Sequence, residues 1–192
     1  MASMTSCGQA KQPQARNDGV VINGIMWATR NVDEAGTFAP TPESAGKFYQ
    51  WNRKKAYSAT YKTITDWDDT TPEGTEWGKA NDPSPAGWRV PTIAEIETLF
   101  DTTKVSHEFT KQNGVFGRKL TDKLTGNSIF IPAARCRDGS TLDNNTITGY
   151  YWSTTLFEND KQYSYCMLFD REGWMTGYFH HTVALSIRSV AE

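Results

Sequence analysis

The stretch PAGWRVPTIAE, residues 85–95, contains the strongest local folding signal in this chain of 192 residues. Thr92 and Glu95 are spaced as a capping box, in which each side chain hydrogen bonds the backbone N–H of the other residue. The apolar residues that follow recur on one helical face: Ile93, Ile96, Leu99 and Phe100. The pattern therefore predicts a helix that begins after Thr92 and ends near Thr102.

Two further elements are indicated before this helix. Residues 20–22 and 25–27 are apolar and flank Asn23-Gly24, a dipeptide typical of the two-residue turn of a β-hairpin. Residues 41–56 predict a second helix, which starts after Pro42 and buries a group of aromatic side chains: Phe48, Tyr49 and Trp51.

The rest of the chain is predicted to consist of a long loop and several strands. Residues 57–87 are rich in Thr, Asp, Gly and Pro, and we expect an ordered surface loop anchored by Trp67 and Trp77. In the C-terminal half the pattern changes to strands, which we expect over three ranges: 128–132, 163–169 and 183–190. Hairpin turns are predicted at residues 170–173 and close to Gly177.

The strand predicted over residues 163–169 alternates between two faces. We expect the core face to be the one formed by Tyr163, Tyr165, Met167 and Phe169. The opposite face then consists of Ser164, Cys166 and Leu168. Outside this strand, Trp152 is also assigned to the core.

The composition limits the classes of protein to which this chain can belong. It has 20 Lys and Arg against 22 Asp and Glu, and a net charge of −2 gives no broad attraction to nucleic acid. No run of about 18 apolar residues is present, so no membrane span is predicted. Aromatic residues make up 12% of the chain while hydrophobic residues make up only 38%, which favours a loop-rich domain with aromatic anchors. We expect one domain, over residues 20–192, with no cofactor.

The N-terminal segment and the cysteines each leave two interpretations open. Residues 1–19 are polar and lack periodicity, which predicts a flexible leader. Within them Met4-Thr5-Ser6-Cys7-Gly8 is similar to the end of a bacterial lipoprotein signal, but the upstream basic and apolar regions are absent. Cys7 is therefore either a lipid anchor or a free thiol. Cys136 and Cys166 form either a disulfide or two unpaired small residues, and no Cys-x-x-Cys pair indicates structural zinc.

A series of short motifs occurs in order along residues 20–190: Ile22-Asn23-Gly24, Trp27-Ala28-Thr29, Phe48-Tyr49-Gln50-Trp51-Asn52-Arg53, Pro85–Thr92, Phe130-Ile131-Pro132-Ala133-Ala134, Gly149–Thr155 and Ser186–Val190. Together they resemble the Fibrobacter succinogenes major paralogous domain, a family abundant in bacterial surface lipoproteins and similar to C-type lectin-like domains and formylglycine-generating enzymes. The resemblance implies an α+β, C-type lectin-like fold with a twisted antiparallel sheet, about two helices and long ordered loops.

The chain departs from this family at four cysteine-related positions. The family usually carries a cysteine just before the Pro-x-Gly-Trp-Arg run and another just after the final arginine, where this chain has Ser84 and Ser189. Their joint absence implies that one disulfide has been lost as a unit. Conversely, Cys136 and Cys166 fall where the family more often has tyrosine or other surface residues, which leaves a new cross-link between neighbouring strands open.

No motif for metal-dependent sugar binding or for catalysis is present. The triplets of calcium-dependent lectins are absent, and the nearest sequence, Trp67-Asp68-Asp69, is interpreted as acidic turn residues beside a buried Trp. A calcium site on Asp138 and Asp143 stays open. None of the histidines has a recognisable nucleophile beside it: His107, His180 and His181. We therefore predict no metal site, no catalytic residue and no enzyme, with a formylglycine-generating-like thiol oxidase as the least favoured alternative.

Recognition is the function that the composition favours. Residues 156–185 combine Tyr, Trp, Arg and His, which are typical of binding hot spots, and aromatic rings also stack on sugars. We predict a ligand-binding site of ten residues: Cys136, Phe157, Asn159, Cys166, Leu168, Arg171, Trp174, Tyr178, His180 and His181. Four of them are expected at the surface: Trp174, Tyr178, His180 and His181.

The chain is thus predicted to be a non-enzymatic recognition or adhesion domain that binds a protein or glycan ligand on another cell or surface. The resemblance implies display on a bacterial cell surface or an extracellular appendage. It also implies a variable protein of a diversity-generating retroelement, although a fixed adhesin shows the same pattern. The alternative from another class is a structural module that spaces or caps a surface assembly. The sequence leaves the oligomeric state open.

Overall fold

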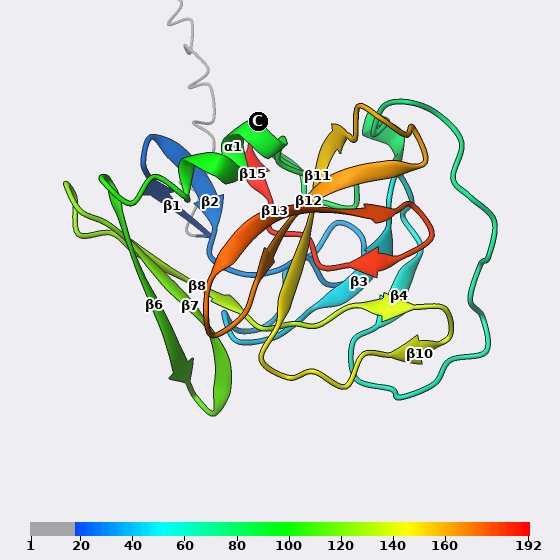
Figure 1. Ribbon diagram of the computed structural model, residues 1–192, viewed down its shortest axis with the longest axis horizontal. Helices are drawn as coiled ribbons and strands as arrows, with labels where there is room; N and C mark the ends of the chain where they lie inside the picture. The colour runs from blue at the N-terminus through cyan, green and yellow to red at the C-terminus, as the bar shows by residue number, and fades with distance from the viewer. Residues whose placement is uncertain (1–17) are drawn as a thin grey trace, which may run out of the picture.

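The computed structural model of the protein describes residues 18–192 (Figure 1). The predicted leader over residues 1–19, with Cys7, lies outside the described residues except for its last two positions. Gly19 already belongs to the first strand, and the backbone carbonyl of Asp18 accepts a hydrogen bond from Thr29 N at 2.7 Å. These last two positions of the predicted leader therefore belong to the folded structure.

The described residues form a mostly β structure, and the predicted fold class is wrong. They contain fifteen strands in four sheets, the single α-helix α1 (Ile93–Thr98) and the short 3₁₀ helix η1 (Lys79–Asn81). An α+β domain with about two helices is thereby excluded, and a C-type lectin-like fold is not confirmed. The difference arises because one of the two predicted helices is a pair of strands.

Each sheet pairs its strands in antiparallel fashion. The first sheet has the order β1 (Gly19–Ile22), β2 (Ile25–Ala28), β15 (Val190–Ala191), β5 (Trp88–Arg89). The second has the order β10 (Thr141–Leu142), β9 (Arg137–Asp138), β14 (Ala184–Leu185), β3 (Lys47–Gln50), β4 (Ala56–Ser58). The third, called the aromatic sheet, consists of β11 (Gly149–Leu156), β12 (Tyr163–Phe169) and β13 (Trp174–His180). The fourth, called the hairpin sheet, consists of β6 (Val105–Gln112), β7 (Val115–Asp122) and β8 (Ser128–Pro132).

The two strongest local signals are confirmed. Thr92 caps α1 and forms the predicted capping box with Glu95, each side chain bonding the other residue's backbone N–H. The helix ends at Thr98, one turn earlier than predicted. Asn23 and Gly24 adopt positive φ angles of 46° and 81°, the geometry that a tight hairpin turn between β1 and β2 requires.

The helix predicted over residues 41–56 is instead formed by β3 and β4. Gly46 has a φ of +68°, and a Cβ there would lie 2.1 Å from the backbone oxygen of Val32. This close approach lets Lys47 N bond Val32 O at 3.1 Å, which draws the segment into extended pairing. The predicted burial of its aromatic side chains is confirmed for Phe48, Tyr49 and Trp51.

Two predictions near the C-terminus also need correction. The strand expected over residues 183–190 is split into β14 and β15, because the intervening Arg188 is buried and donates to Ala28 O and Phe130 O, both at 3.1 Å. Gly177 lies in the middle of β13 rather than in a turn. The turn at residues 170–173 is confirmed by the bond from Asp170 N to Gly173 O at 3.0 Å.

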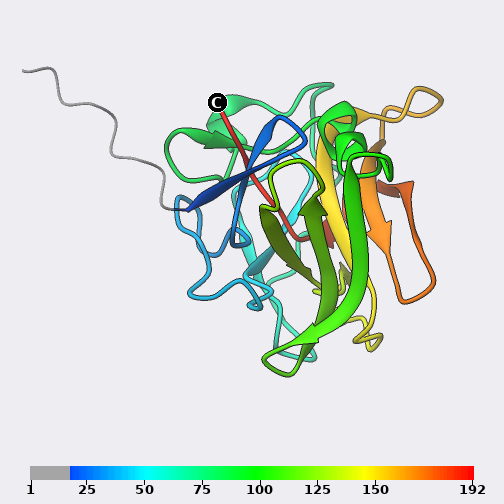
Figure 2. The same cartoon turned by 90° about the vertical axis from the view of Figure 1, so that its left-hand side faces the viewer.

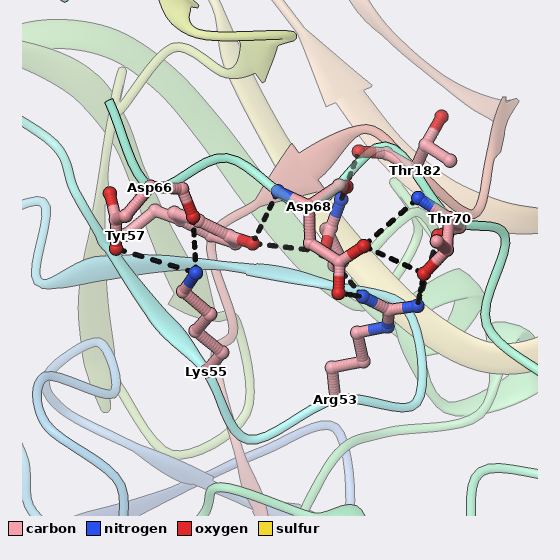
Figure 3. A network of polar contacts seen from close by, with 8 residues as sticks. Arg53, Lys55, Tyr57, Asp66, Asp68, Thr70 and Thr182 are labelled. Atoms are coloured by element: carbon pink, nitrogen blue, oxygen red, sulfur yellow. Dashed lines mark hydrogen bonds and ion pairs between the residues drawn. The ribbon is translucent and has the colours of Figure 1, made fainter. Parts of the chain in front are cut away.

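The long segment between β4 and α1 is ordered by side chains, as predicted. Trp67 and Trp77 each pack on the ring of a buried aromatic residue, at centroid distances of 4.8 and 5.5 Å. Figure 3 shows polar contacts that hold the same segment, in which Arg53 contacts the Asp68 carboxylate and donates to Thr70 O at 2.9 Å. Thr70 Oγ1 also donates to Asp68 at 2.6 Å. Asp68, in the sequence nearest to a lectin calcium motif, therefore serves to fasten this loop.

Two hydrophobic clusters fill the interior. The larger one joins α1 to side chains from all four sheets and includes Phe169. The smaller one lies behind β11 and β12 and includes Trp152, so both predicted core residues are confirmed. Ser84 and Ser189, for which the resemblance implied a lost disulfide, lie in contact, with their hydroxyl oxygens 2.8 Å apart.

Candidate ligand-binding surface

An aromatic cluster lies on the solvent side of β12 and β13 and on the loop that precedes β12. We call it the aromatic surface, and it consists of Phe157, Tyr163, Tyr165, Tyr178 and His180. The rings of Phe157 and Tyr178 stack at 4.1 Å with an interplanar angle of 10°. Tyr178 is nonetheless 53% exposed, which places a stacked pair of rings at the boundary with water.

Strand pairing brings these side chains together. Tyr165 pairs with Tyr178 across β12 and β13, and Tyr163 pairs with His180, so all four project from the same face. The ring of Tyr163 meets His180 edge-on at 5.2 Å, and Tyr165 meets Phe157 edge-on at 5.5 Å. Four of the five rings are therefore carried by the sheet, and Phe157 is supplied by the loop before β12.

The first half of the same face is covered. Trp174 packs edge-on against Phe100 at 3.6 Å, and Thr176 Oγ1 lies 3.4 Å from Glu97 of α1. Tyr178, two residues further along β13, is the first residue of this face that is exposed. The end of the helix thus determines where the aromatic surface begins.

The loop that supplies Phe157 is held by its own backbone. Phe157 N donates to Tyr163 O at 2.9 Å, and Tyr163 N donates to Asp160 O at 3.1 Å. The Asp160 carboxylate accepts from Gln162 N at 2.9 Å. A ligand that binds here meets rings that are already in position, which lowers the entropic cost of association.

Polar groups lie beside the rings. The Tyr165 hydroxyl donates to the carboxylate of Glu158; this bond lowers the pKa of Glu158 and raises the pKa of Tyr165. His180 Nδ1 lies 2.7 Å from Thr182 Oγ1, which orients the imidazole. The surface therefore offers ring faces together with hydroxyl, carboxylate and imidazole groups at its rim.

The prediction that His181 lies at the surface is wrong. Its ring is buried and stacks on Trp51 at 4.1 Å with an angle of 11°, and Nε2 lies 2.9 Å from Ser164 Oγ. Burial, with the nearby His180, lowers the pKa of His181 to about 4. Its neighbour His180 points to the opposite side because successive residues of an extended chain alternate in direction.

Three more predicted site residues are buried or half-buried. Cys136 and Cys166 are buried with free thiols, and burial raises both pKa values to about 12. Of the two alternatives for this pair, the structure therefore shows unpaired residues in the smaller core cluster. Trp174 is half-buried and packs against the larger cluster, contrary to its expected surface position.

The remaining predicted residues lie around the aromatic surface or behind it. Asn159 is exposed in the loop after Phe157, and Arg171 is exposed in the turn before β13. Leu168 projects from the opposite face of the sheet, beside Met175, with which it pairs. These positions are close in the chain but do not form one continuous site.

Tyr163 and Tyr165 belong to the site although the sequence pattern assigned them to the core. The alternation itself is confirmed, but the two ends of β12 bury opposite faces: Ser164 and Cys166 at one end, Met167 and Phe169 at the other. The available signal was the pair of hydroxyl-bearing rings, which suit an interface with water better than a core.

A large open cleft lies away from the aromatic surface, with a volume of about 840 Å³. Trp77, Trp88 and Arg89 are among the residues that line it. Two of its cationic side chains are paired within the protein: Lys79 contacts Glu192 at 3.1 Å, and Arg89 contacts Glu95 at 2.5 Å. Lys54 and Glu76 also line it.

Within residues 18–192, no group of three or more His, Cys, Asp or Glu side chains is arranged to hold a metal ion. Across the same residues, no helix is both long and apolar enough to cross a membrane. Comparisons of the chain with protein-family models, with curated proteins and with solved structures found no match.

Proposed function

We propose that this chain is a non-enzymatic recognition domain that binds a protein or glycan ligand through the aromatic surface. The observation that carries the proposal is the exposed ring of Tyr178, stacked on Phe157 and mounted on a sheet. Exposure of such a ring to water is unfavourable, and a ligand that covers the ring gains the free energy of burying its apolar area.

The chemistry of the surface suits this role. Tyrosine and histidine combine a flat apolar area with a polar tip and few rotatable bonds, so little side-chain entropy is lost on binding. Ring faces stack on the apolar faces of sugars and on protein side chains, while the hydroxyl of Tyr163 and the imidazole of His180 supply hydrogen bonds. The ordered loop at Phe157 supports the same conclusion, because a preformed site binds more tightly.

The test compares two exposed tyrosines. Tyr178→Ala removes the central ring of the aromatic surface, and Tyr61→Ala removes a ring that is 70% exposed outside it. After a ligand has been found on a glycan and protein array, Tyr178→Ala should weaken its binding at least about tenfold. Tyr61→Ala should leave binding unchanged, and neither variant should shift the melting temperature appreciably.

Equal binding by the wild type and by Tyr178→Ala would contradict the proposal. A wild-type protein that binds nothing on such arrays, and that is captured only by proteins of its own assembly, would instead support a structural module. The thiol-oxidase alternative is not supported by the environment of Cys136 and Cys166. Both thiols are buried with raised pKa values, whereas reactive cysteines are accessible and have lowered pKa values.

Display on a bacterial surface and diversification by a retroelement remain predictions from the sequence resemblance. Deep sequencing of the region that encodes residues 130–190, across one source population, tests the second of them. Substitutions concentrated at exposed positions of the aromatic surface, such as Tyr178, would support diversification. A uniform sequence would indicate a fixed module.

A further inference from the structure

The outer edge of β13 has no partner in the described part of the chain. In the aromatic sheet the strand order is β11, β12, β13, and β13 pairs along its whole length with β12 alone. Figure 2 shows it as the outermost strand of this sheet. The opposite edge, formed by β11, is covered: Trp152 N donates to Ser186 O at 3.0 Å and Thr154 N donates to Pro91 O at 2.8 Å.

The hydrogen bonds at the two ends of β13 show which backbone groups face outward. Gly173 O accepts from Asp170 N at 3.0 Å, and His181 N donates to Gln162 O at 2.9 Å. Since bonded and non-bonded pairs alternate in an antiparallel ladder, the odd-numbered residues between them direct their N–H and C=O groups towards β12. The backbone groups of Thr176 and Tyr178 therefore point away from the sheet, and no backbone bond between residues 18 and 192 satisfies them.

The side chains of β13 do nothing to prevent pairing at this edge. The strand reads Trp174-Met175-Thr176-Gly177-Tyr178-Phe179-His180 and contains no Lys, Arg, Asp, Glu or Pro. All seven residues stay in register with β12, so no bulge twists the edge away. Natural proteins protect exposed edges with charges, prolines or bulges, and an edge that lacks all three accepts another strand.

We propose that the β13 edge binds β13 of a second copy of this chain, so that two aromatic sheets form one continuous antiparallel sheet. With the two-fold axis at Gly177, Thr176 of each copy exchanges its N–H and C=O bonds with Tyr178 of the other. These are the outward-facing groups, so the pairing satisfies them reciprocally.

The side chains match in this register. On the face opposite the aromatic surface, Met175 of one copy lies across from Phe179 of the other. Met175 is 59% exposed and Phe179 is partly exposed, so the pair buries apolar area that the single copy leaves in water. Gly177 meets its own counterpart on the axis, where no side chain obstructs the approach. No charged residue lies within the strand itself; a neighbouring carboxylate, that of Glu97 on α1, lies 3.4 Å from Thr176 Oγ1 on the aromatic-surface side.

Dimer formation does not cover the proposed binding site. Tyr163 and His180 remain on the solvent side of the sheet, and the two aromatic surfaces lie next to each other across the axis. A repetitive ligand could then engage both at once, which raises the overall affinity without any new contact. The inference about pairing is independent of the identity of that ligand.

The experiment measures the molar mass of the full chain by sedimentation across protein concentrations from about 10 to about 500 µM. The wild type should shift from monomer to dimer over this range. Met175→Lys places a charge opposite the apolar Phe179 of the other copy and should raise the dimer dissociation constant at least about tenfold. Leu124→Lys is the matched control, because Leu124 is 94% exposed in the turn between β7 and β8 and should leave dimerisation unchanged.

A cross-link tests the register. Two residues on a two-fold axis at a non-bonded position lie about 4.5 Å apart, within the range that a disulfide spans. Cys7→Ser/Cys166→Ala/Gly177→Cys should therefore form a covalent dimer under mild oxidation, whereas Cys7→Ser/Cys166→Ala should not. The Cys7 substitution removes a second thiol that could cross-link two copies, and the Cys166 substitution removes the native thiol, which would lie 3.7 Å from the new Cβ and compete for it.

A wild-type protein that stays monomeric at the highest concentration overturns the proposal and leaves a strand of another protein as the occupant of this edge. Open-ended aggregation in place of a dimer overturns it as well, because a two-fold pair closes on itself. Equal dimerisation by Met175→Lys, or equal disruption by Leu124→Lys, would place the contact elsewhere.

Discussion

The hairpin sheet and the aromatic sheet have the same strand arrangement, but the side chains on their outer edge strands differ in charge. Each has three antiparallel strands in sequential order, and each leaves a long strand, β6 or β13, at one edge. The edge strand β6 carries Glu108 and Lys111, both exposed, whereas β13 carries no charged residue. A charged edge stays in water and an uncharged edge accepts a strand, so the comparison indicates which side of the molecule is available for assembly.

The two sheets are also in contact, and Arg118 is one of the residues that link them; another contact joins His107 of β6 to Trp174 of β13, whose ring centroids lie 4.1 Å apart. Arg118 lies on β7, is buried, and donates through Nη2 to Asp170 O at 2.8 Å and to Gly173 O at 2.7 Å, in the turn of the aromatic sheet. Figure 2 shows the two sheets side by side. The hairpin sheet therefore positions the start of β13, although the two edges differ in character.

The largest effect on stability is expected from removing the hydrogen bonds of Arg118 between the two sheets. Arg118→Ala removes two charge-assisted hydrogen bonds and leaves a cavity, and we expect it to lower the free energy of unfolding by about 4 kcal/mol. Arg171→Ala, on the exposed arginine of the same turn, should change it by less than about 0.5 kcal/mol. Urea titrations of both variants measure the difference, and a mild effect of Arg118→Ala would show that the sheets are held together by apolar packing alone.

Two glycines, one in each sheet, differ in how closely their surroundings are packed. A Cβ at Gly117 of β7 would lie 2.4 Å from Ile131 O and 2.5 Å from the Phe130 ring, whereas a Cβ at Gly177 of β13 meets nothing closer than 3.7 Å. Gly117→Ala should therefore destabilise the protein by about 3 kcal/mol, and Gly177→Ala should stabilise it by about 0.5 kcal/mol.

Thermal and urea unfolding of the two alanine variants check this prediction. Similar losses in both would mean that the space beside β13 is already filled, contrary to the open packing around its central glycine.

A histidine lies in or beside each sheet, His107 half-buried on β6 and His181 buried just after β13, and acid should affect them unequally. Burial lowers the pKa of His107 on β6 and lowers the pKa of His181, which follows β13, to about 4. The unfolded chain protonates histidine near its ordinary pKa of about 6.5, so between pH 6.5 and 4 the unfolded state binds more protons and stability falls with decreasing pH. Above pH 6.5 this contribution is complete and constant.

We expect His181 to account for about 3 kcal/mol of lost stability between pH 6.5 and pH 4. Unfolding free energies measured across this range should show a flatter profile for His181→Gln than for the wild type, with a smaller flattening for His107→Gln. The carboxylates contribute equally in all three proteins, so the differences between profiles isolate the histidines. Parallel profiles for the wild type and His181→Gln would contradict the assignment.

The smallest effect on stability is expected from removing the charges of the β6 edge. Glu108→Thr/Lys111→Thr should change the free energy of unfolding by about 0.5 kcal/mol, because both residues are exposed. The same change makes β6 resemble β13 and should increase self-association in sedimentation experiments. Unchanged association would show that something other than charge, such as the twist of the hairpin sheet, protects β6.

Much of the local structure was predictable from the sequence because its causes lie within a few residues. The capping box of Thr92 and Glu95, the Asn23-Gly24 turn and the alternation of β12 each depend on neighbours in the chain. The second helix failed for the opposite reason: the conformation of Gly46 is decided by the backbone of Val32, which lies beside it only in the folded protein. Local propensity cannot predict such a contact between segments that are distant in the sequence.

The candidate site was predicted in part. Phe157, Tyr178 and His180 were identified from composition, because a segment that combines aromatic residues with Arg and His is typical of binding hot spots. Tyr163 and Tyr165 were assigned to the core, because the period of a strand separates its two faces but does not say which face is covered, or that the covered face changes along the strand.

By itself, the sequence determined the turn, the helix cap, the strand over Tyr163–Phe169 with its alternation, and the low net charge, all of which follow from short-range sterics and from counting. Only the tertiary structure decided that His181 is buried while His180 is not, that α1 ends where the aromatic surface begins, and that β13 lies at an open edge. These features depend on which distant segments pack on a given residue. Burial is a property of the folded whole, whereas propensity is a property of the chain.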